Sequence, residues 1–253
     1  MSALHIERYG HGPNTIVGFH GWGADHQKSF RRVIKRLPDE ETTFWGIDLP
    51  GFGQSPKPAD FTYANVTGQL TAAVDEILED GQQATFIGAC SGSYHVLEMA
   101  RQRPERTKRL VVTEPLAFYP WFFKIFTRGG FGQLLYDLIF ANPVGRRVTQ
   151  TALEKLKVAN AFDVMESFGK LDRTVPIQYL KFYRQLGTAD QFSILEMPIV
   201  LLHGANTWGV ATESVDIWMD VLPDVTPVRV DDVGHLVNQE APEFVAELLL
   251  NGH

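Results

Sequence analysis

The sequence predicts an α/β protein in which helices cover both faces of a mostly parallel, twisted sheet. Short apolar runs rich in β-branched residues alternate with longer amphipathic runs. Several of the short runs show no alternation of polar residues, which is typical of strands buried on both faces. The 253 residues, 44% hydrophobic and 21% charged, are enough for one globular domain with an inserted subdomain.

The expected strands and helices follow one another along the chain. A first strand at 4–9 is expected to turn at 10–14 and to form a hairpin with the next strand. Strands that alternate with helices predict parallel pairing. The further strands are expected at 15–20, 44–48, 84–87, 109–113, 199–203 and 227–230, and the helices at 27–37, 63–79, 93–103, 212–221 and 242–250.

One region interrupts this alternation. Between the strands at 109–113 and 199–203 the sequence shows only helical and loop patterns, and the region begins with a dense group of aromatic residues. A crossover loop rarely needs this length, so an inserted lid is expected. We therefore predict a core of residues 1–115 and 197–253 and a mainly helical cap of residues 116–196.

Composition excludes several classes of partner. The net charge is −7, and the basic run at 31–36 lies on an amphipathic segment, as a solvated helix face would. No nucleic-acid partner is therefore expected. The N-terminus has no signal-peptide pattern and no run of about 18 apolar residues occurs, so we expect a cytoplasmic protein with no membrane partner. The oligomeric state is left open.

No cofactor and no metal are expected. Cys90 is the single cysteine, which excludes a CxxC site, and no HxxxH pattern or cluster of carboxylates occurs. The turn at 51–53 lacks the third glycine of a phosphate-binding loop. Cys90 is thus expected to be either a buried apolar residue or a reactive group.

Four motifs in order carry a family resemblance. "FHGWG" (19–23), "GIDLPGFGQS" (46–55) and "GACSG" (88–92) each follow an expected strand, and "DDVGHLVNQEAPEFV" (231–245) lies near the C-terminus. Together they resemble the α/β-hydrolase superfamily, in its cap-bearing subgroup, with a cysteine at the nucleophile elbow. The resemblance covers nearly the whole chain outside the expected cap, and four motifs at family spacing are far more specific than one pentapeptide.

Glycine spacing indicates which residue is the nucleophile. In this family the nucleophile lies in a strained turn between strand and helix, and the residues two positions away must be small. Gly88 and Gly92 flank Cys90 in this way, whereas alanine and serine flank Ser91, which makes Ser91 the poorer alternative. A thiolate depends less on its base than a serine hydroxyl does. The resemblance implies that Cys90 is the nucleophile.

The base and the acid follow from the same resemblance. His235 stands on a loop before the last helix, where the family places its catalytic base. The usual G-x-x-D turn has Thr207 in place of the aspartate, and threonine carries no negative charge. Some members, haloalkane dehalogenases among them, carry the acid after the strand that the family counts as its sixth. That strand corresponds here to the expected strand at 109–113, and Glu114 stands at its end. The alternatives for the acid are Asp231, Asp232, Glu213 or a Cys–His pair without an acid.

The motif "FHGWG" implies an oxyanion hole. The backbone N–H groups of Trp22 and Ser91 would bind the developing oxyanion. His20, in the same motif, is expected to be structural.

The resemblance implies a hydrolase that cleaves a small ester, thioester or lactone through an acyl-enzyme on Cys90, or an acyltransferase that passes the acyl group to another acceptor. The aromatic residues of the expected cap indicate a small apolar acyl or ring-bearing substrate. The missing aspartate favours an alternative, a catalytically silent small-molecule binding protein of the same fold.

Overall fold

In a computed structural model of the chain, which describes residues 4–155, 165–169 and 171–251, seven strands form one sheet. Their order is β1-β3-β2-β4-β5-β6-β7, and all described pairs except β1–β3 are parallel. This confirms the predicted fold class. The strands are β1 (Ile6–Gly10), β2 (Asn14–Phe19), β3 (Thr42–Ile47), β4 (Ala84–Ala89), β5 (Thr107–Thr113), β6 (Ile199–Gly204) and β7 (Val225–Val230).

The predicted hairpin between the first two strands is wrong. β1 pairs antiparallel with β3, with Ile6 opposite Ile47, and β3 lies between β1 and β2. After β1 the chain still forms hydrogen bonds to the segment around the start of β3. The N–H of His11 donates to the carbonyl of Asp39, and the N–H of Gly12 donates to the carbonyl of Thr42. β2 uses its other edge for β4. A buried strand needs partners on both edges, and β1 supplies the second one for β3.

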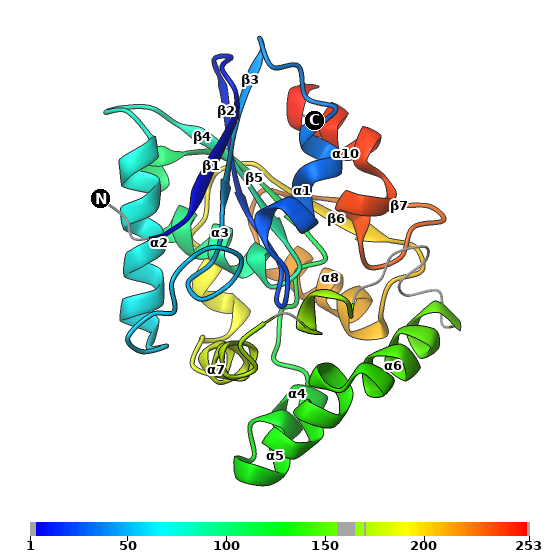
Figure 1. Cartoon of the computed structure of the whole chain (residues 1–253). Helices are drawn as coiled ribbons and strands as arrows, with labels where there is room; N and C mark the ends of the chain where they lie inside the picture. Colours follow the sequence, from blue (N-terminus) through cyan, green and yellow to red (C-terminus); the bar gives the residue numbers. More distant parts are fainter. Residues whose placement is uncertain (1–3, 156–164, 170, 252–253) are drawn as a thin grey trace.

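Helices cover both faces of the sheet, as Figure 1 shows. On one face Leu70, Val96 and Trp218 belong to one buried apolar cluster, and on the other Phe30 and Val245 belong to a second. Burial of these apolar stripes holds the helices in place. The first face carries α2 (Tyr63–Ile77), α3 (Gly92–Gln102), followed by the 3₁₀ turn η1 (Pro104–Arg106), and α8 (Gly209–Val221); the second carries α1 (His26–Ile34), α9 (Val237–Glu240) and α10 (Pro242–Asn251).

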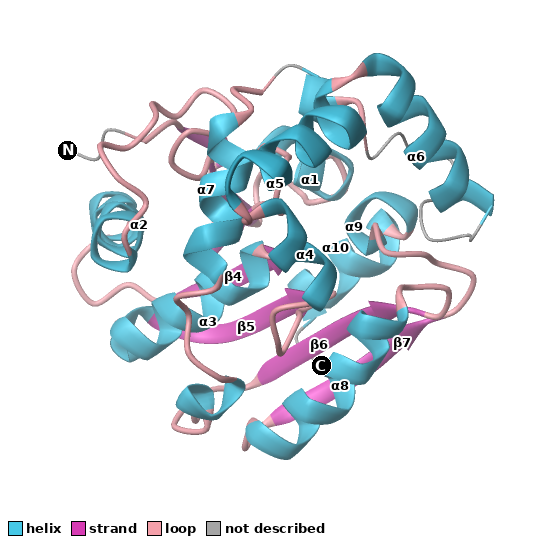
Figure 2. Cartoon of the chain, turned by 90° about the horizontal axis from the view of Figure 1, so that it is seen from below, coloured by secondary structure: helices cyan, strands magenta, loops and turns pink. Residues whose placement is uncertain are grey.

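Helical segments fill the region between β5 and β6. In Figures 1 and 2, α4, α5 and α6 lie beyond the sheet and not against its faces. Phe126, Tyr136 and Phe168 belong to a third buried cluster that contains only residues of this region. The cap boundaries 116–196 stay a prediction, and residues 156–164 and 170 of it lie outside the described residues. The segments are α4 (Trp121–Phe126), α5 (Gly129–Tyr136), the π-helix η2 (Asp137–Ala141), α6 (Pro143–Lys155), η3 (Ser167–Gly169), α7 (Thr174–Tyr183) and η4 (Ala189–Phe192).

None of the helices in the described part of the chain is both long and apolar enough to cross a bilayer.

Candidate active site

Cys90 occupies the tight turn between β4 and α3. Its φ is +50°, a left-handed conformation that a residue with a side chain adopts only under strain, whereas Ser91 has an ordinary φ of −63°. A Cβ added to Gly88 would lie 2.4 Å from Cα of Ser93, and one added to Gly92 would lie 2.1 Å from the carbonyl oxygen of Phe19. Both glycines are therefore required, and the turn that they allow is centred on Cys90.

Glu114 and His235 lie together at the ends of neighbouring elements. Glu114 directly follows β5, has a φ of +56° and is only 1% exposed. Its Oε2 lies 3.2 Å from Nδ1 of His235, and its Oε1 accepts a hydrogen bond of 2.7 Å from the N–H of Gly204. A buried carboxylate is tolerated where it is paired and hydrogen-bonded. The structure thus brings together two of the three residues of the predicted triad.

The third residue, Cys90, acts on the same imidazole. Burial lowers the pKa of His235, but the charge of the neighbouring Cys90 thiolate and its hydrogen bond, together with the carboxylate of Glu114, raise it well above its ordinary value. The indole of Trp208 stacks on the imidazole, with ring centroids 5.2 Å apart and an angle of 29°. His235 is therefore positioned between a thiol and a carboxylate and can hold a proton near neutral pH.

The alternative acids do not contact His235. Asp231 forms an ion pair of 3.8 Å with Arg229 and its side chain is 86% exposed. Asp232 and Glu213 are also exposed. Of the four carboxylates that the sequence offered, Glu114 is the buried one and lies within hydrogen-bond distance of the imidazole.

The loop after β2 lies against Cys90. A Cβ added to Gly21 would be 3.4 Å from Cβ of Cys90, and the turn that follows is closed by the N–H of Ala24, which donates to Gly21. His20 bonds the carbonyl of Gly21 through Nδ1 and accepts from the N–H of Leu49 through Nε2, which agrees with its expected structural role. Within the described residues, neither the Trp22 N–H nor the Ser91 N–H donates to a protein acceptor. Two backbone donors are thus available beside the thiol.

A cavity of about 430 Å³ opens onto Cys90, Ser91 and His235. Of the aromatic residues at the start of the expected cap, Trp121 and Phe131 point to solvent, with exposures of 70% and 66%. The others reach the cavity, so this region supplies much of its apolar wall. The aromatic residues from this region that line the cavity include Phe118, Tyr119, Phe122, Phe123 and Phe126.

Comparison with known proteins agrees with this architecture. The family model of the alpha/beta hydrolase fold matches residues 14–242. The chain belongs to this family. The pimeloyl-[acyl-carrier protein] methyl ester esterase of Nitrosomonas europaea is 24% identical over 261 residues, which cover 96% of each protein.

Two further proteins are similar to this chain. The protein of the same name from Methylococcus capsulatus is 35% identical over 101 residues, 40% of this chain and 36% of that protein. A thermophilic esterase from Thermogutta terrifontis has a TM-score of 0.75 and 18% identity, and the match covers 97% of this chain and 91% of that one. The latter similarity is one of fold.

Two residues beside the imidazole were missed as site residues at the level of sequence. Thr207 and Trp208 both lie next to His235, in the turn where this hydrolase family usually carries its acid. The sequence shows that the aspartate is absent from this turn, but a threonine and a tryptophan there form no recognisable motif. Their position in that turn was the available signal.

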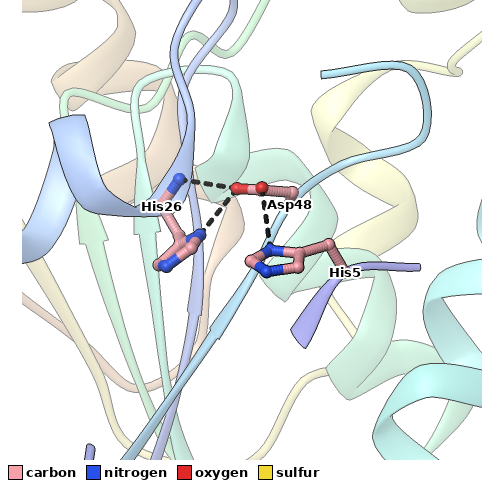
Figure 3. A group of neighbouring side chains, drawn as sticks. All are labelled: His5, His26 and Asp48. Atoms are coloured by element: carbon pink, nitrogen blue, oxygen red, sulfur yellow. Dashed lines mark hydrogen bonds and ion pairs between the residues drawn. The ribbon is translucent and has the colours of Figure 1, made fainter. Parts of the chain in front are cut away.

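A second cluster of titratable residues lies outside the cavity. His5, His26 and Asp48 offer three metal-ligating atoms within 4.8 Å of one another, a grouping that the sequence did not suggest (Figure 3). Asp48, however, already accepts hydrogen bonds from Nδ1 of His26 at 2.7 Å and from the His26 N–H at 3.0 Å, and it lies 3.1 Å from Nδ1 of His5. The ligating atoms are thus engaged with one another, as in a buried ion-pair network.

Proposed function

We propose that this protein is an ester hydrolase that works through a Cys90 acyl-enzyme. The observation that supports it best is the position of His235, with the Glu114 carboxylate 3.2 Å from Nδ1 and with Cys90 as its other charged neighbour. A nucleophile, a base and a group that orients the base are the parts that acyl transfer requires. The two relatives named as pimeloyl-[acyl-carrier protein] methyl ester esterases support a carboxylic ester as the substrate class.

The first half of the reaction forms a thioester. The Cys90 thiolate attacks the ester carbonyl carbon, and the electron pair of the C=O bond moves to oxygen. The backbone N–H groups of Trp22 and Ser91 donate to that oxyanion. When the intermediate collapses, the C–O bond to the alcohol breaks, and Nε2 of the protonated His235 gives its proton to the leaving alkoxide.

The second half returns the enzyme to its starting state. Neutral His235 takes a proton from water, and the hydroxide attacks the thioester carbon. The C–S bond breaks, the thiolate leaves, and the carboxylic acid is released. Glu114 accepts a hydrogen bond from Nδ1 and stabilises the imidazolium in both halves. The apolar cavity favours a small apolar acyl group or ring as the bound part.

Intact-mass spectrometry on mixing with activated acyl esters and thioesters tests this proposal. Wild type is expected to gain an acyl adduct that decays, and Cys90→Ala is expected to gain none. Ser91→Ala, which changes the neighbouring side chain, serves as the matched control and should still acylate. Because Cys90 is the single cysteine, a hydroxylamine-sensitive adduct that is absent from Cys90→Ala is assigned to this thiol.

The outcomes separate the competing functions. Faster decay on addition of an alcohol, thiol or amine would indicate acyl transfer to that acceptor. Saturable binding of an apolar ester without any adduct would instead favour the non-catalytic binding protein and overturn the proposal. An adduct that persists in Cys90→Ala but not in Ser91→Ala would assign the nucleophile to the serine.

A further inference from the structure

The side chain of Thr207 lies beside both Glu114 and His235. Its Oγ1 is 2.5 Å from Oε2 of Glu114 and 3.3 Å from Nδ1 of His235. A carboxylate has no proton to give, and a hydroxyl has one. Thr207 therefore donates to Glu114 in a short, charge-assisted hydrogen bond, which is stronger than a bond between neutral groups.

One turn after β6 binds both oxygens of the Glu114 carboxylate. Gly204, at the start of this turn, donates its N–H to Oε1, and Thr207, at its end, donates its hydroxyl to Oε2. The turn is closed by the N–H of Thr207, which donates to the carbonyl of Gly204 at 3.3 Å. Two donors at fixed separation define the plane of the carboxylate and leave Oε2 facing His235.

We propose that Thr207 is a positioning residue that holds the carboxylate of Glu114 against His235, so that an acid from β5 works in the place left by the missing aspartate after β6. The inference rests on the proposed function for its consequence in catalysis. Its geometry is independent of the substrate, because it concerns three side chains of the protein alone.

Two conservative variants test the hydroxyl. Thr207→Val keeps the shape of the side chain but removes the donor, and Thr207→Ser keeps the donor. Loss of a hydrogen bond to a charged group is expected to lower kcat for ester hydrolysis at least about tenfold in Thr207→Val, with KM nearly unchanged. Thr207→Ser should stay within about threefold of wild type. Thermal unfolding of both variants checks that the fold is intact.

Moving the carboxylate from position 114 to position 207 tests whether the two positions serve the same imidazole nitrogen. Glu114→Gln removes the charge and should lower kcat about a hundredfold or more. Adding Thr207→Asp to Glu114→Gln returns a carboxylate to the other side of the same imidazole nitrogen, and kcat should recover at least about tenfold. A double variant no more active than Glu114→Gln would overturn the inference, as would equal activities for Thr207→Val and Thr207→Ser.

A second readout needs no substrate. The rate at which iodoacetamide alkylates the single cysteine reports how much thiolate is present. Among the described residues, Cys90 and Glu114 are the titratable groups that raise the pKa of His235. A loosened carboxylate should therefore move the alkylation profile of Thr207→Val to higher pH, while that of Thr207→Ser should match wild type. If no ester is hydrolysed by wild type, the proposed function fails, and this profile still decides the role of Thr207. Identical profiles for all three proteins would exclude it.

Discussion

At the scale of single residues, the chemistry proposed for the site depends on the proton that His235 carries. Burial lowers the pKa of this histidine, but the Cys90 thiolate and the Glu114 carboxylate raise it well above 6.5. The imidazolium is therefore the prevailing form at neutral pH, and its positive charge favours the thiolate. The positive charge of the imidazolium is therefore present below the raised pKa of His235 and is lost as the pH rises through that value.

This pairing predicts a shift in thiol reactivity. His235→Gln removes the positive charge, so the pH profile of alkylation by iodoacetamide should move upward by about one unit or more. His11→Gln replaces an exposed histidine and should leave the profile unchanged. Stopped-flow or mass-spectrometric alkylation between pH 5 and pH 9 measures both. Superimposable profiles for wild type and His235→Gln would contradict the ion pair.

Motifs and spacing in the sequence mark Cys90, His235 and Glu114 as candidates, and the contact between Glu114 and His235 is present in the structure. The contact between Glu114 and Thr207 could not be anticipated, since 93 positions separate the two residues in sequence and no pattern shows which hydroxyl will meet a given carboxylate. The grouping of His5, His26 and Asp48 was missed for the same reason. Sequence motifs mark candidate reactive residues, whereas the side chains that contact them are set by the packing of β5 against β6.

At the scale of elements, the start of α3 tolerates no side chain at its first residue. A Cβ added to Gly92 would lie 2.1 Å from the carbonyl oxygen of Phe19 and 2.5 Å from that of His20. Gly92→Ala is therefore expected to lower the free energy of unfolding by about 1–3 kcal/mol, because backbone on both sides must move. The strained turn that holds Cys90 would be displaced with it, so alkylation should also slow.

A matched glycine gives the opposite expectation. Gly68 lies in α2, is exposed, and a Cβ added to it would meet nothing within 4 Å. Gly68→Ala should raise the free energy of unfolding by about 0.5–1 kcal/mol through helix propensity. Urea denaturation of the two variants gives the comparison, and a Gly92→Ala protein as stable as wild type would contradict the predicted overlap.

The Asp48 network predicts a pH-dependent stability. Burial raises the pKa of Asp48, but His26 and His20 lower it further than burial raises it. Burial lowers the pKa of His26, but Asp48 and Glu7 raise it. A histidine whose pKa is raised by folding stabilises the folded protein fully below its unfolded value, near 6.5, and this contribution declines as pH rises through the raised value.

Asp48→Asn should remove this contribution. Since His26 would lose a buried charged partner, the variant is expected to be less stable by about 3 kcal/mol at pH 6, with a smaller difference above pH 8. The exposed Asp39 supplies the control, and Asp39→Asn should change stability by no more than about 0.5 kcal/mol. Urea titrations at pH 6, 7 and 8 make the measurement. A difference that grows from pH 6 to pH 8 would reverse the predicted sign.

The order of strands shows where sequence patterns stop being informative. The parallel strands from β2 to β7 were predicted to within a few residues because each is a short apolar run between helices. The partner of β1 was not, because the glycine-rich segment at 10–14 is equally compatible with a hairpin and with a crossing beyond β3. β1 pairs with the edge of β3 that β2 leaves free, and that edge exists only once the sheet is assembled.

At the scale of the whole molecule, Trp22 joins the sheet to the helices between β5 and β6. Its Nε1 donates to the carbonyl of Pro176 in α7 at 2.9 Å, and its ring contacts Phe123 and Phe168, with centroids 5.6 Å and 4.8 Å away. Its backbone meanwhile lies in the loop that reaches Cys90. The position of the helical region is thus coupled to the geometry of the proposed oxyanion hole through one residue.

Under the proposed function, we predict that the wall of the cavity selects the acyl group by size. Phe123 lines the cavity and contacts Trp22, so Phe123→Ala opens space for a longer acyl group. One methylene in an apolar pocket changes kcat/KM by about tenfold or more, and the ratio of kcat/KM for a long-chain to a short-chain ester should rise by that factor. Phe131, exposed to 66%, is the matched phenylalanine, and Phe131→Ala should leave the ratio unchanged. A series of p-nitrophenyl esters of increasing acyl length gives the ratio, and an equal rise in both variants would show that the wall does not select the acyl group.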